Sequence, residues 1–314
     1  MAVAVVVALA LLSLTIGAAH TSIADMWRDP FSHEILTISR VPRTAAVLLA
    51  GSAMAVSGLV MQHLTRNRFV SPSTAGTVDA AALGALFTLL VMAGAPVMVK
   101  IIVATGFALA GTGIFLVIIH RVRLRDVVFV PLVGLVLGGI YRAIAEFVAL
   151  RENLSQSLQV WLNGDFSGVI LGRYETLWFA GGAALLVYLF ARRFTAAGLG
   201  RDTAISLGIN YRAVMAGGLS LAALTTAVVV VTVGAIPFLG LVVPNVVTMT
   251  LGDNLRKVLP ATALAGAGVT LACDILGRIV IFPYEIPVGS IAGVLGAGVF
   301  AALVLRKGAR YGSA

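Results

Sequence analysis

The sequence predicts an all-α integral membrane protein with ten transmembrane helices in a single domain, residues 1–314. Hydrophobic residues make up 60% of the chain and charged residues only 11%, whereas about a quarter of a water-soluble domain is charged. The mean hydropathy is +1.04. Apolar runs of roughly 17 to 25 residues recur along the chain, and such runs cross a bilayer as helices because each backbone amide must be bonded within its own segment.

The candidate spans follow one another closely, which leaves no room between them for a second domain. They cover residues 2–19, 44–62, 74–93, 97–119, 127–150, 175–192, 213–233, 235–250, 258–278 and 287–305. The first lacks the basic start of a signal peptide, so we interpret it as a membrane helix. The eighth is short, and Pro237, Gly240 and Pro244 predict that it is broken.

The basic residues predict the orientation of the chain in the membrane. The net charge is +9, but these residues are dispersed over short loops instead of forming the stripe typical of nucleic-acid binding. Ten spans place both termini on one side. If that side is the cytoplasm, the inner loops hold 14 of the 22 Lys and Arg, namely Arg66, Arg68, Arg121, Arg123, Arg125, Arg192, Arg193, Arg201, Arg212, Arg256, Lys257, Arg306, Lys307 and Arg310. Because cytoplasmic loops are enriched in such residues, we expect a multi-pass protein of the cytoplasmic membrane with both termini inside.

Small side chains predict close helix packing around the second span. Between residues 51 and 58 the chain carries Gly51, Ser52, Ala53, Ala55, Ser57 and Gly58, and small residues let neighbouring membrane helices approach. We therefore expect this span at the centre of the bundle. The charged and aromatic segment before it suits an outer loop with one short helix on the membrane surface. After it, Pro72 is expected to open the third span.

The longest inner loop, residues 192–212, predicts two short helices. Gly198 to Gly200 would separate them, Asp202 would lie at the start of the second helix, and Gly208 would end it.

Two short stretches suggest an inverted repeat of several helices. "AAALGALFTLL" at 80–90 and "ATALAGAGVTL" at 261–271 are alike, and Pro/Gly breaks follow the second and seventh spans. Segments built from few apolar residue types also match by chance.

Several kinds of site are absent from the sequence. No GxxxxGK[ST] phosphate loop occurs, so the chain cannot hydrolyse ATP alone. Cys273 has no partner for an intrachain disulfide and is expected to pack as a small apolar side chain. The histidines have no metal-ligand spacing, so we expect neither a metal site nor a cofactor bound by this chain; they are His20, His33, His63 and His120.

Three longer stretches closely resemble the FecCD family of ABC-importer permeases: residues 40–67, 197–209 and 234–307. Within that family, "SLQVWLNGDFSGVILGRYE" at 157–175 and "DILGRIVIFPYEIPVG" at 274–289 look most like the catecholate-siderophore branch, similar to anguibactin, vibriobactin and petrobactin permeases.

The resemblance implies a type II ABC importer permease fold. Such a subunit is not an enzyme. It pairs with a second copy or a homologous permease, with a dimer of ATPases that hold ATP and Mg, and with an extracytoplasmic siderophore-binding protein. It would pass a ferric siderophore inward by alternating access. A haem or cobalamin permease stays open as an alternative. Outside the family, the alternatives are an ion-coupled secondary transporter, which needs an intramembrane proton or sodium site, and a membrane scaffold that transports nothing.

The resemblance also implies roles for charged residues at the outer mouth. Arg40 and Arg43 match the family's R-x-P-R, and Arg278 matches a third arginine that docks acidic residues of the binding protein. The alternative is that these arginines only anchor helix ends at the headgroups. Asp274, four residues before Arg278, is expected to pair with it.

The turn between the ninth and tenth spans contains the family's Glu-x-Pro-x-Gly, here Glu285, Pro287 and Gly289. Pro287 suits the first turn of a helix, and Gly289 allows close packing. Glu285 would either stabilise the start of the tenth helix or hold Arg278 or Arg43 in place.

The inner loop 192–212 matches the coupling helices that contact the ATPase in this family. Gly198 and Gly200 would form the bend. Leu199 and Ile205 would give apolar contact, and Arg201 and Asp202 polar contact. An ordinary basic inner loop is the alternative.

The fifth span contains two ionisable residues, Arg142 and Glu146, which share a helix face and could pair. The resemblance places them beside the translocation path, where Arg142 would attract an anionic chelate. A structural ion pair is the alternative. Asp79 in the third span has no role that the sequence explains.

Overall fold

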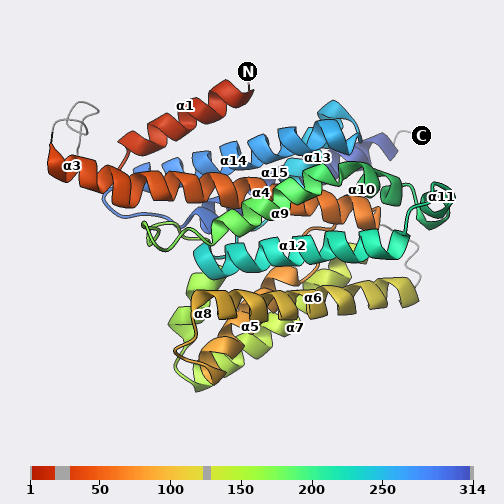
Figure 1. The fold of residues 1–314 in the computed structure, drawn as a ribbon, viewed down its shortest axis with the longest axis horizontal. Helices are drawn as coiled ribbons and strands as arrows, with labels where there is room; N and C mark the ends of the chain where they lie inside the picture. The colour runs from red at the N-terminus through yellow and green to blue at the C-terminus, as the bar shows by residue number, and fades with distance from the viewer. Residues whose placement is uncertain (1, 18–28, 123–128, 312–314) are drawn as a thin grey trace.

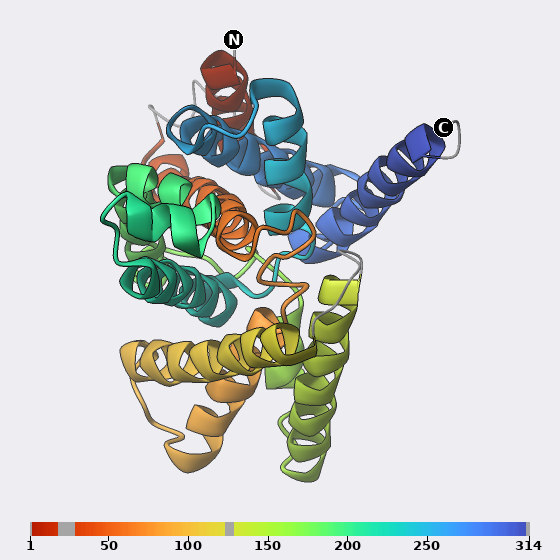
Figure 2. The same ribbon diagram turned by 90° about the vertical axis from the view of Figure 1, so that its right-hand side faces the viewer.

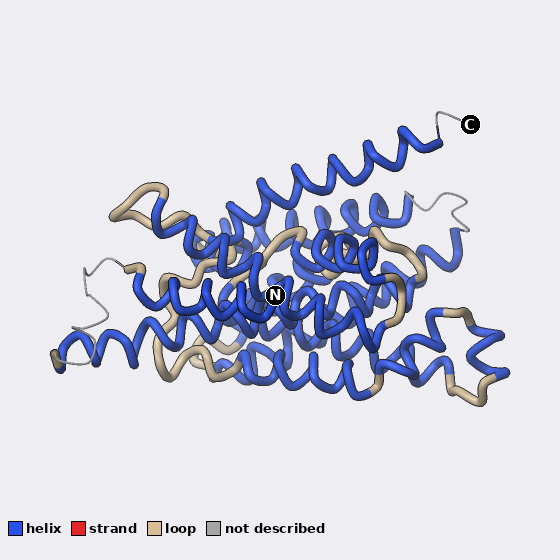
Figure 3. Tube along the Cα trace, turned by 90° about the horizontal axis from the view of Figure 1, so that it is seen from above, coloured by secondary structure: helices blue, strands red, loops and turns tan. Residues whose placement is uncertain are grey.

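The structure, a computed structural model, describes residues 2–17, 29–122 and 129–311. Every regular element in these ranges is a helix (Figure 3). Five helices are long and apolar enough to cross a membrane, one bent pair makes a sixth candidate, and four apolar helices are shorter. Each predicted span coincides with one of these units.

The helices in chain order are α1 (Ala2–Thr15), α3 (Pro30–Ile35), the π-helical turn η1 (Leu36–Arg40), α4 (Val41–Thr65), α5 (Thr77–Val91), α6 (Val97–Val122), α7 (Phe129–Arg151), α8 (Ser155–Leu162), α9 (Leu177–Leu189), α10 (Ala191–Gly198), α11 (Arg201–Ser206), α12 (Tyr211–Val233), α13 (Leu239–Leu251), α14 (Leu255–Ile279) and α15 (Val288–Tyr311). Figure 1 shows α3 and α11 at opposite ends of the bundle. We call the end near α3 the outer end and the end near α11 the inner end, after the predicted orientation.

In the part of the outer segment that the structure describes, residues 29–40, the helix before the second span is continuous with that span and does not lie separately on the membrane surface. Residues Pro30–Thr65 form one continuous helical stretch through α3, η1 and α4. It begins at Pro30, which suits a first helical position, after Asp29, whose carboxylate accepts hydrogen bonds from the backbone N and the Oγ of Ser32. These bonds lower the pKa of Asp29. The residues before Asp29 in this segment lie outside the described ranges.

Helix α4 occupies the centre of the bundle, as its small residues predict. It packs against α14, α12, α13 and α9 (Figure 2). A Cβ on Gly51 would lie 2.7 Å from the Gly266 carbonyl oxygen, and one on Gly58 would overlap the Gly240 carbonyl. The backbones of α4, α13 and α14 therefore approach more closely than any side chain would allow.

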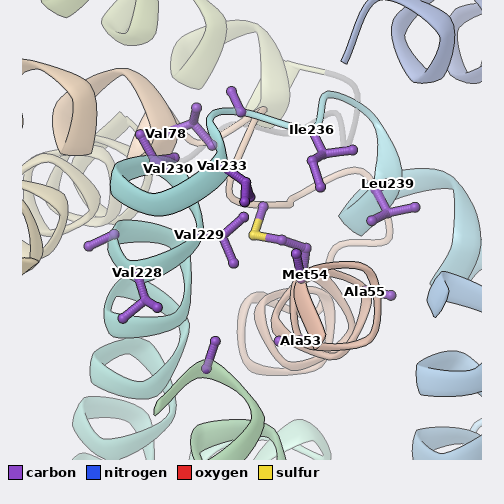
Figure 4. Packing of buried hydrophobic residues seen from close by; sticks show 14 of the residues in the cluster. Ala53, Met54, Ala55, Val78, Val228, Val229, Val230, Val233, Ile236 and Leu239 are labelled. Carbon is purple, nitrogen blue, oxygen red and sulfur yellow. The ribbon is translucent and has the colours of Figure 1, made fainter. Parts of the chain in front are cut away.

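Apolar side chains fill the space between α4 and α12. Met54 of α4 is 1% exposed and faces Val229 and Val233 of α12, with Ile236 beside them (Figure 4). Removing such a side chain from a close-packed core costs about 2–5 kcal/mol.

A buried non-helical segment, residues 66–76, connects α4 to α5. Ser71 and Ala75 are fully buried, and the Ser71 backbone N donates to Thr74 Oγ1 over 2.8 Å. The segment ends at Gly76, whose φ of 74° is left-handed. The third span therefore begins at Thr77 and not at Pro72, because the chain first folds back into the bundle.

A second non-helical segment, residues 234–238, precedes α13. The Ala235 backbone N donates to the Trp161 carbonyl and the Val233 carbonyl accepts from Asp165 N, at 2.9 and 2.8 Å. Helix α8, which the sequence patterns do not predict, and the loop after it thus bond backbone groups at the end of α12 and in this segment that have no partner within a helix.

The break predicted within the eighth span lies only at its start, because Gly240 and Pro244 are inside α13. Proline removes the N–H that would bond the Gly240 carbonyl. Gln62 Nε2 replaces it and lies 3.4 Å from Gly240 O and 3.2 Å from Leu241 O. A side chain of α4 therefore keeps α13 helical through the proline.

The order of helix lengths repeats along the chain. Helices α4 to α7 have 25, 15, 26 and 23 residues, and α12 to α15 have 23, 13, 25 and 24. In each set the first and second helices are separated by a buried break. The sets are five spans apart and so run in opposite directions. The similar stretches at 80–90 and 261–271 lie in α5 and α14, which do not occupy corresponding places, so their likeness does not mark this repeat.

Candidate functional site

Arg43 lies at the centre of a charged cluster at the outer end. Its Nε and Nη2 donate to Asp274 Oδ1 of α14 over 3.1 and 2.8 Å. Its Nη1 donates to Glu285 Oε1 over 3.0 Å, and its Nη2 lies 2.9 Å from Glu285 Oε2. Of the two roles predicted for Glu285, the structure shows that it holds an arginine, and that this arginine is Arg43.

Arg278 forms the predicted ion pair with Asp274, one turn earlier in α14. Its Nε donates to the Asp274 carbonyl over 3.4 Å, and its two terminal nitrogens also reach the end of α1. Nη1 lies 3.0 Å from Ser13 O and 2.7 Å from Ile16 O, and Nη2 donates to Ser13 Oγ over 2.6 Å. The side chain is 5% exposed. Arg278 thus caps the carbonyls that α1 leaves unbonded at its C-terminus.

Arg40, the last residue of η1, also bonds a carbonyl at the C-terminal end of α1. It is 6% exposed, and its Nη1 donates to the Leu14 carbonyl over 2.8 Å. The side chain of Arg43 is 12% exposed. The structure therefore brings the three predicted docking arginines to one end of the bundle, where each also bonds this chain. Their docking of a binding protein stays a prediction.

The turn before α15 packs as its glycine predicts. Gly289 N donates to the Gly164 carbonyl over 2.8 Å, and a Cβ on Gly289 would lie 2.6 Å from Gly164 N. Pro287 immediately precedes α15, and its carbonyl accepts from Ser290 N.

The inner loop forms the two predicted short helices. Helix α10 ends at Gly198 and α11 begins at Arg201, with Gly200 at a φ of 117° that favours glycine. Leu199 and Ile205 are 62% and 55% exposed. Helix α10 bends away from α9 by 66°. The bend leaves two apolar side chains uncovered by this chain, a surface suited to a partner.

A polar cavity of about 310 Å³ lies between this bend and the inner end of α4. Gly198, Leu199 and His63 line it, together with Arg68 and Asp253. Arg68 and Asp253 form an ion pair of 3.0 Å that joins the turn after α4 to the turn before α14. Arg201 and Asp202 are exposed beyond it.

In the membrane-spanning region, Arg142 pairs with Asp79 and not with Glu146, although Arg142 and Glu146 share a helix face. Arg142 Nε donates to Asp79 Oδ1 over 3.0 Å and Nη2 lies 2.9 Å from the same oxygen. Glu146 is exposed. Asp79 is near the start of α5, and the buried segment before α5 carries it to this level of α7. Sequence spacing could not reveal that pairing.

Sequence patterns also do not single out Ser13, Gln62 or Asp253. Each is a polar residue in or beside an apolar helix. Such a residue is expected to have a hydrogen-bond partner, but the sequence does not indicate which one. Within the described ranges, no group of three or more His, Cys, Asp or Glu residues could hold a metal ion; His20 lies outside those ranges.

Comparisons with known proteins identify the family. The FecCD transport family matches residues 5–306. The petrobactin import system permease protein of Bacillus subtilis is 45% identical over 95% of both chains. The ferric-anguibactin permease protein of Vibrio anguillarum is 43% identical over 87% of this chain and 86% of its own.

A solved structure described as an inward-facing metal-chelate type ABC transporter has the same fold. Its TM-score is 0.82, with 23% identity over 97% of both chains. The match along nearly the whole length, together with the ten apolar helical units, identifies this chain as a member of the FecCD transport family, a permease subunit of an ABC transporter.

Proposed function

We propose that this chain is the membrane permease of an ATP-driven importer for ferric siderophores. The observation that carries the proposal is its 41–45% identity to permeases named for petrobactin and anguibactin. The more distant relatives include an iron-hydroxamate permease of Bacillus subtilis at 32% identity. The nearer group favours a catecholate chelate as the ligand.

The partners follow from this role. A binding protein outside the membrane would deliver the chelate at the outer end, where Arg40, Arg43 and Arg278 gather. An ATPase dimer with ATP and Mg would contact Leu199 and Ile205 at the inner end, with Arg201 and Asp202 at its rim. A second permease, identical or homologous, would complete the passage, with both termini in the cytoplasm.

The transport step would be alternating access. The two buried breaks, residues 66–76 and 234–238, interrupt helices at corresponding points of the repeated unit. Hinge residues, which absorb the backbone rotation in such motions, lie in loops or at the ends of helices. Closure of the ATPases would tilt α10 and α11 and, through α9 and α12, the rest of the bundle. Ligand choice would reside mainly in the binding protein.

Uptake by the complex in proteoliposomes tests this function. We expect ATP-dependent accumulation of an iron-loaded catecholate siderophore in the presence of the cognate binding protein. An ATPase subunit that cannot hydrolyse ATP should abolish uptake. Uptake that survives this change but collapses when the ion gradient is dissipated would indicate a secondary transporter instead. A binding protein that holds haem or cobalamin and no ferric siderophore would contradict the ligand class.

A further inference from the structure

The start of α5 lies inside the bundle and not at its surface. Gly76, which precedes α5, is packed against Gly138 of α7, since a Cβ on Gly76 would lie 3.0 Å from Gly138 N. Gly138 is nine residues after Phe129, or ~14 Å along α7 at 1.5 Å per residue. Residues in the first turn of α5 therefore lie deep in the bundle, at the level of Gly138 of α7, although they directly follow a connecting segment.

Asp79 is one of these residues, and the fold makes space for its carboxylate. A Cβ on Gly138 would lie 2.7 Å from Asp79 Oδ2, so glycine is required there if the carboxylate is to stay in place. Asp79 is 8% exposed. Its Oδ1 faces both Nε and Nη2 of Arg142, and this fixes the plane of the guanidinium group.

Arg142 is held but not enclosed. Its side chain is 49% exposed, and among the described residues Nη1 has no acceptor. Arg142 is ~20 Å from Phe129 and ~14 Å from Arg151 along α7, well within a hydrocarbon layer of ~30 Å. Glu146 is exposed one turn further on. Two ionisable groups at this depth are costly against lipid, so this side of α7 meets water or polar protein.

We propose that Arg142 contacts the anionic oxygens of the transported chelate in a water-filled passage along α7, and that Asp79 is the residue that positions it. This inference rests on the transport function proposed above. Asp79 accepts from one edge of the guanidinium and leaves the Nη1 donors directed away from the pair. It also offsets the positive charge of Arg142, which keeps the contact weak enough for the ligand to leave, as a passage requires.

A charged-reagent experiment tests the passage without any chelate. The background is Cys273→Ala, which removes the single, buried cysteine, in the reconstituted complex. Glu146→Cys is the reporter. Ile144→Cys is the control, because Ile144 is also exposed, at 47%, but lies on the other side of α7. The probes are an anionic and a cationic methanethiosulfonate reagent.

We expect both reagents to modify the thiol introduced by Glu146→Cys, and neither to modify the thiol introduced by Ile144→Cys at a comparable rate. Adding Arg142→Gln should lower the anionic-to-cationic rate ratio by about threefold or more, and Asp79→Asn should raise it, as one charge within several ångströms implies. Protection of both introduced thiols, or a rate ratio that does not change with Arg142→Gln, would overturn the proposal. This conclusion would hold whichever ligand the complex transports.

Uptake and ATPase activity, measured together, distinguish contact with the ligand from a structural role. Arg142→Gln should reduce uptake of an anionic ferric tris-catecholate by about tenfold, the size expected for one lost charge-assisted hydrogen bond. Binding-protein-stimulated ATPase activity should persist, and Arg142→Lys should recover part of the uptake. Equal loss of uptake and ATPase activity would indicate a structural ion pair. Failure of the unmodified complex to carry any ferric chelate would instead refute the proposed function.

Discussion

Arg43 and Glu285 are 242 positions apart in sequence, yet their side chains form a two-point ion pair, with Nη1 and Nη2 at 3.0 and 2.9 Å from the two carboxylate oxygens. Asp274 holds the other edge of the same guanidinium. The pair therefore fixes the turn before α15 to α4 and α14, at the end of the bundle where we propose that the binding protein docks.

The two acids of this cluster should differ strongly in their contribution to stability. Asp274 is fully buried between two arginines, so Asp274→Asn leaves both charges poorly compensated and should lower the free energy of unfolding by about 3–5 kcal/mol. Glu285 is 31% exposed, so Glu285→Gln should cost less than about 1 kcal/mol. Denaturant unfolding in detergent measures both. Equal effects would mean that the cluster does not hold Asp274 as described.

Arg278→Gln should detach the end of α1 from α14. The guanidinium donates to the Ser13 carbonyl of α1, to the Ile16 carbonyl just after α1 and to Ser13 Oγ, and each buried acceptor left unbonded costs about 1–3 kcal/mol. A Cβ on Gly268 would lie 3.4 Å from Val6 Cγ2, so Val6→Cys with Gly268→Cys reports on this contact in a Cys273→Ala background. We expect disulfide formation to fall with Arg278→Gln and to persist with Arg173→Gln, which changes an exposed arginine elsewhere. Unchanged cross-linking in Arg278→Gln would contradict the capping role.

Gly58→Ala should prevent the normal packing of α4 on α13. The added methyl group would overlap the Gly240 carbonyl, and backbone cannot move aside as a flexible side chain can, so the cost should reach or exceed the ~1–3 kcal/mol typical of overpacking. Gly106→Ala on α6 is the matched control, because nothing lies within 4 Å of its added Cβ. It should be neutral or should stabilise by up to about 1 kcal/mol. Thermal unfolding in detergent distinguishes them, and similar melting temperatures would show that the close approach is absent.

Leu199→Glu combined with Ile205→Glu should release the ATPase. Both side chains are more than half exposed on the bend between α10 and α11, and burying a new charge against an apolar partner surface is unfavourable. Copurification of the ATPase with the tagged permease measures the effect. Arg173→Gln again serves as a control away from the bend. Full recovery of the ATPase with the double variant would exclude this surface as the coupling contact.

The sequence by itself determined the membrane class, the number and order of the apolar spans, the central place of α4 and the two short helices of the inner loop. These features depend on the composition of contiguous segments: apolar length, small residues and glycines at a bend. The Asp274–Arg278 pair was also predictable, since one helical turn separates the two residues.

Only the tertiary structure decided which charged residues meet across helices. Arg142 has Glu146 one turn away, but it pairs with Asp79, because the buried segment 66–76 brings the start of α5 to the middle of α7. Pro244 remains inside a helix because Gln62, on another helix, bonds the carbonyl that the proline leaves free. Arg43 and Glu285 meet because close backbone packing of α4 and α14 brings together residues far apart in the chain. Such contacts depend on the depth and spacing of helices in the bundle, and local sequence periodicity contains no information about either.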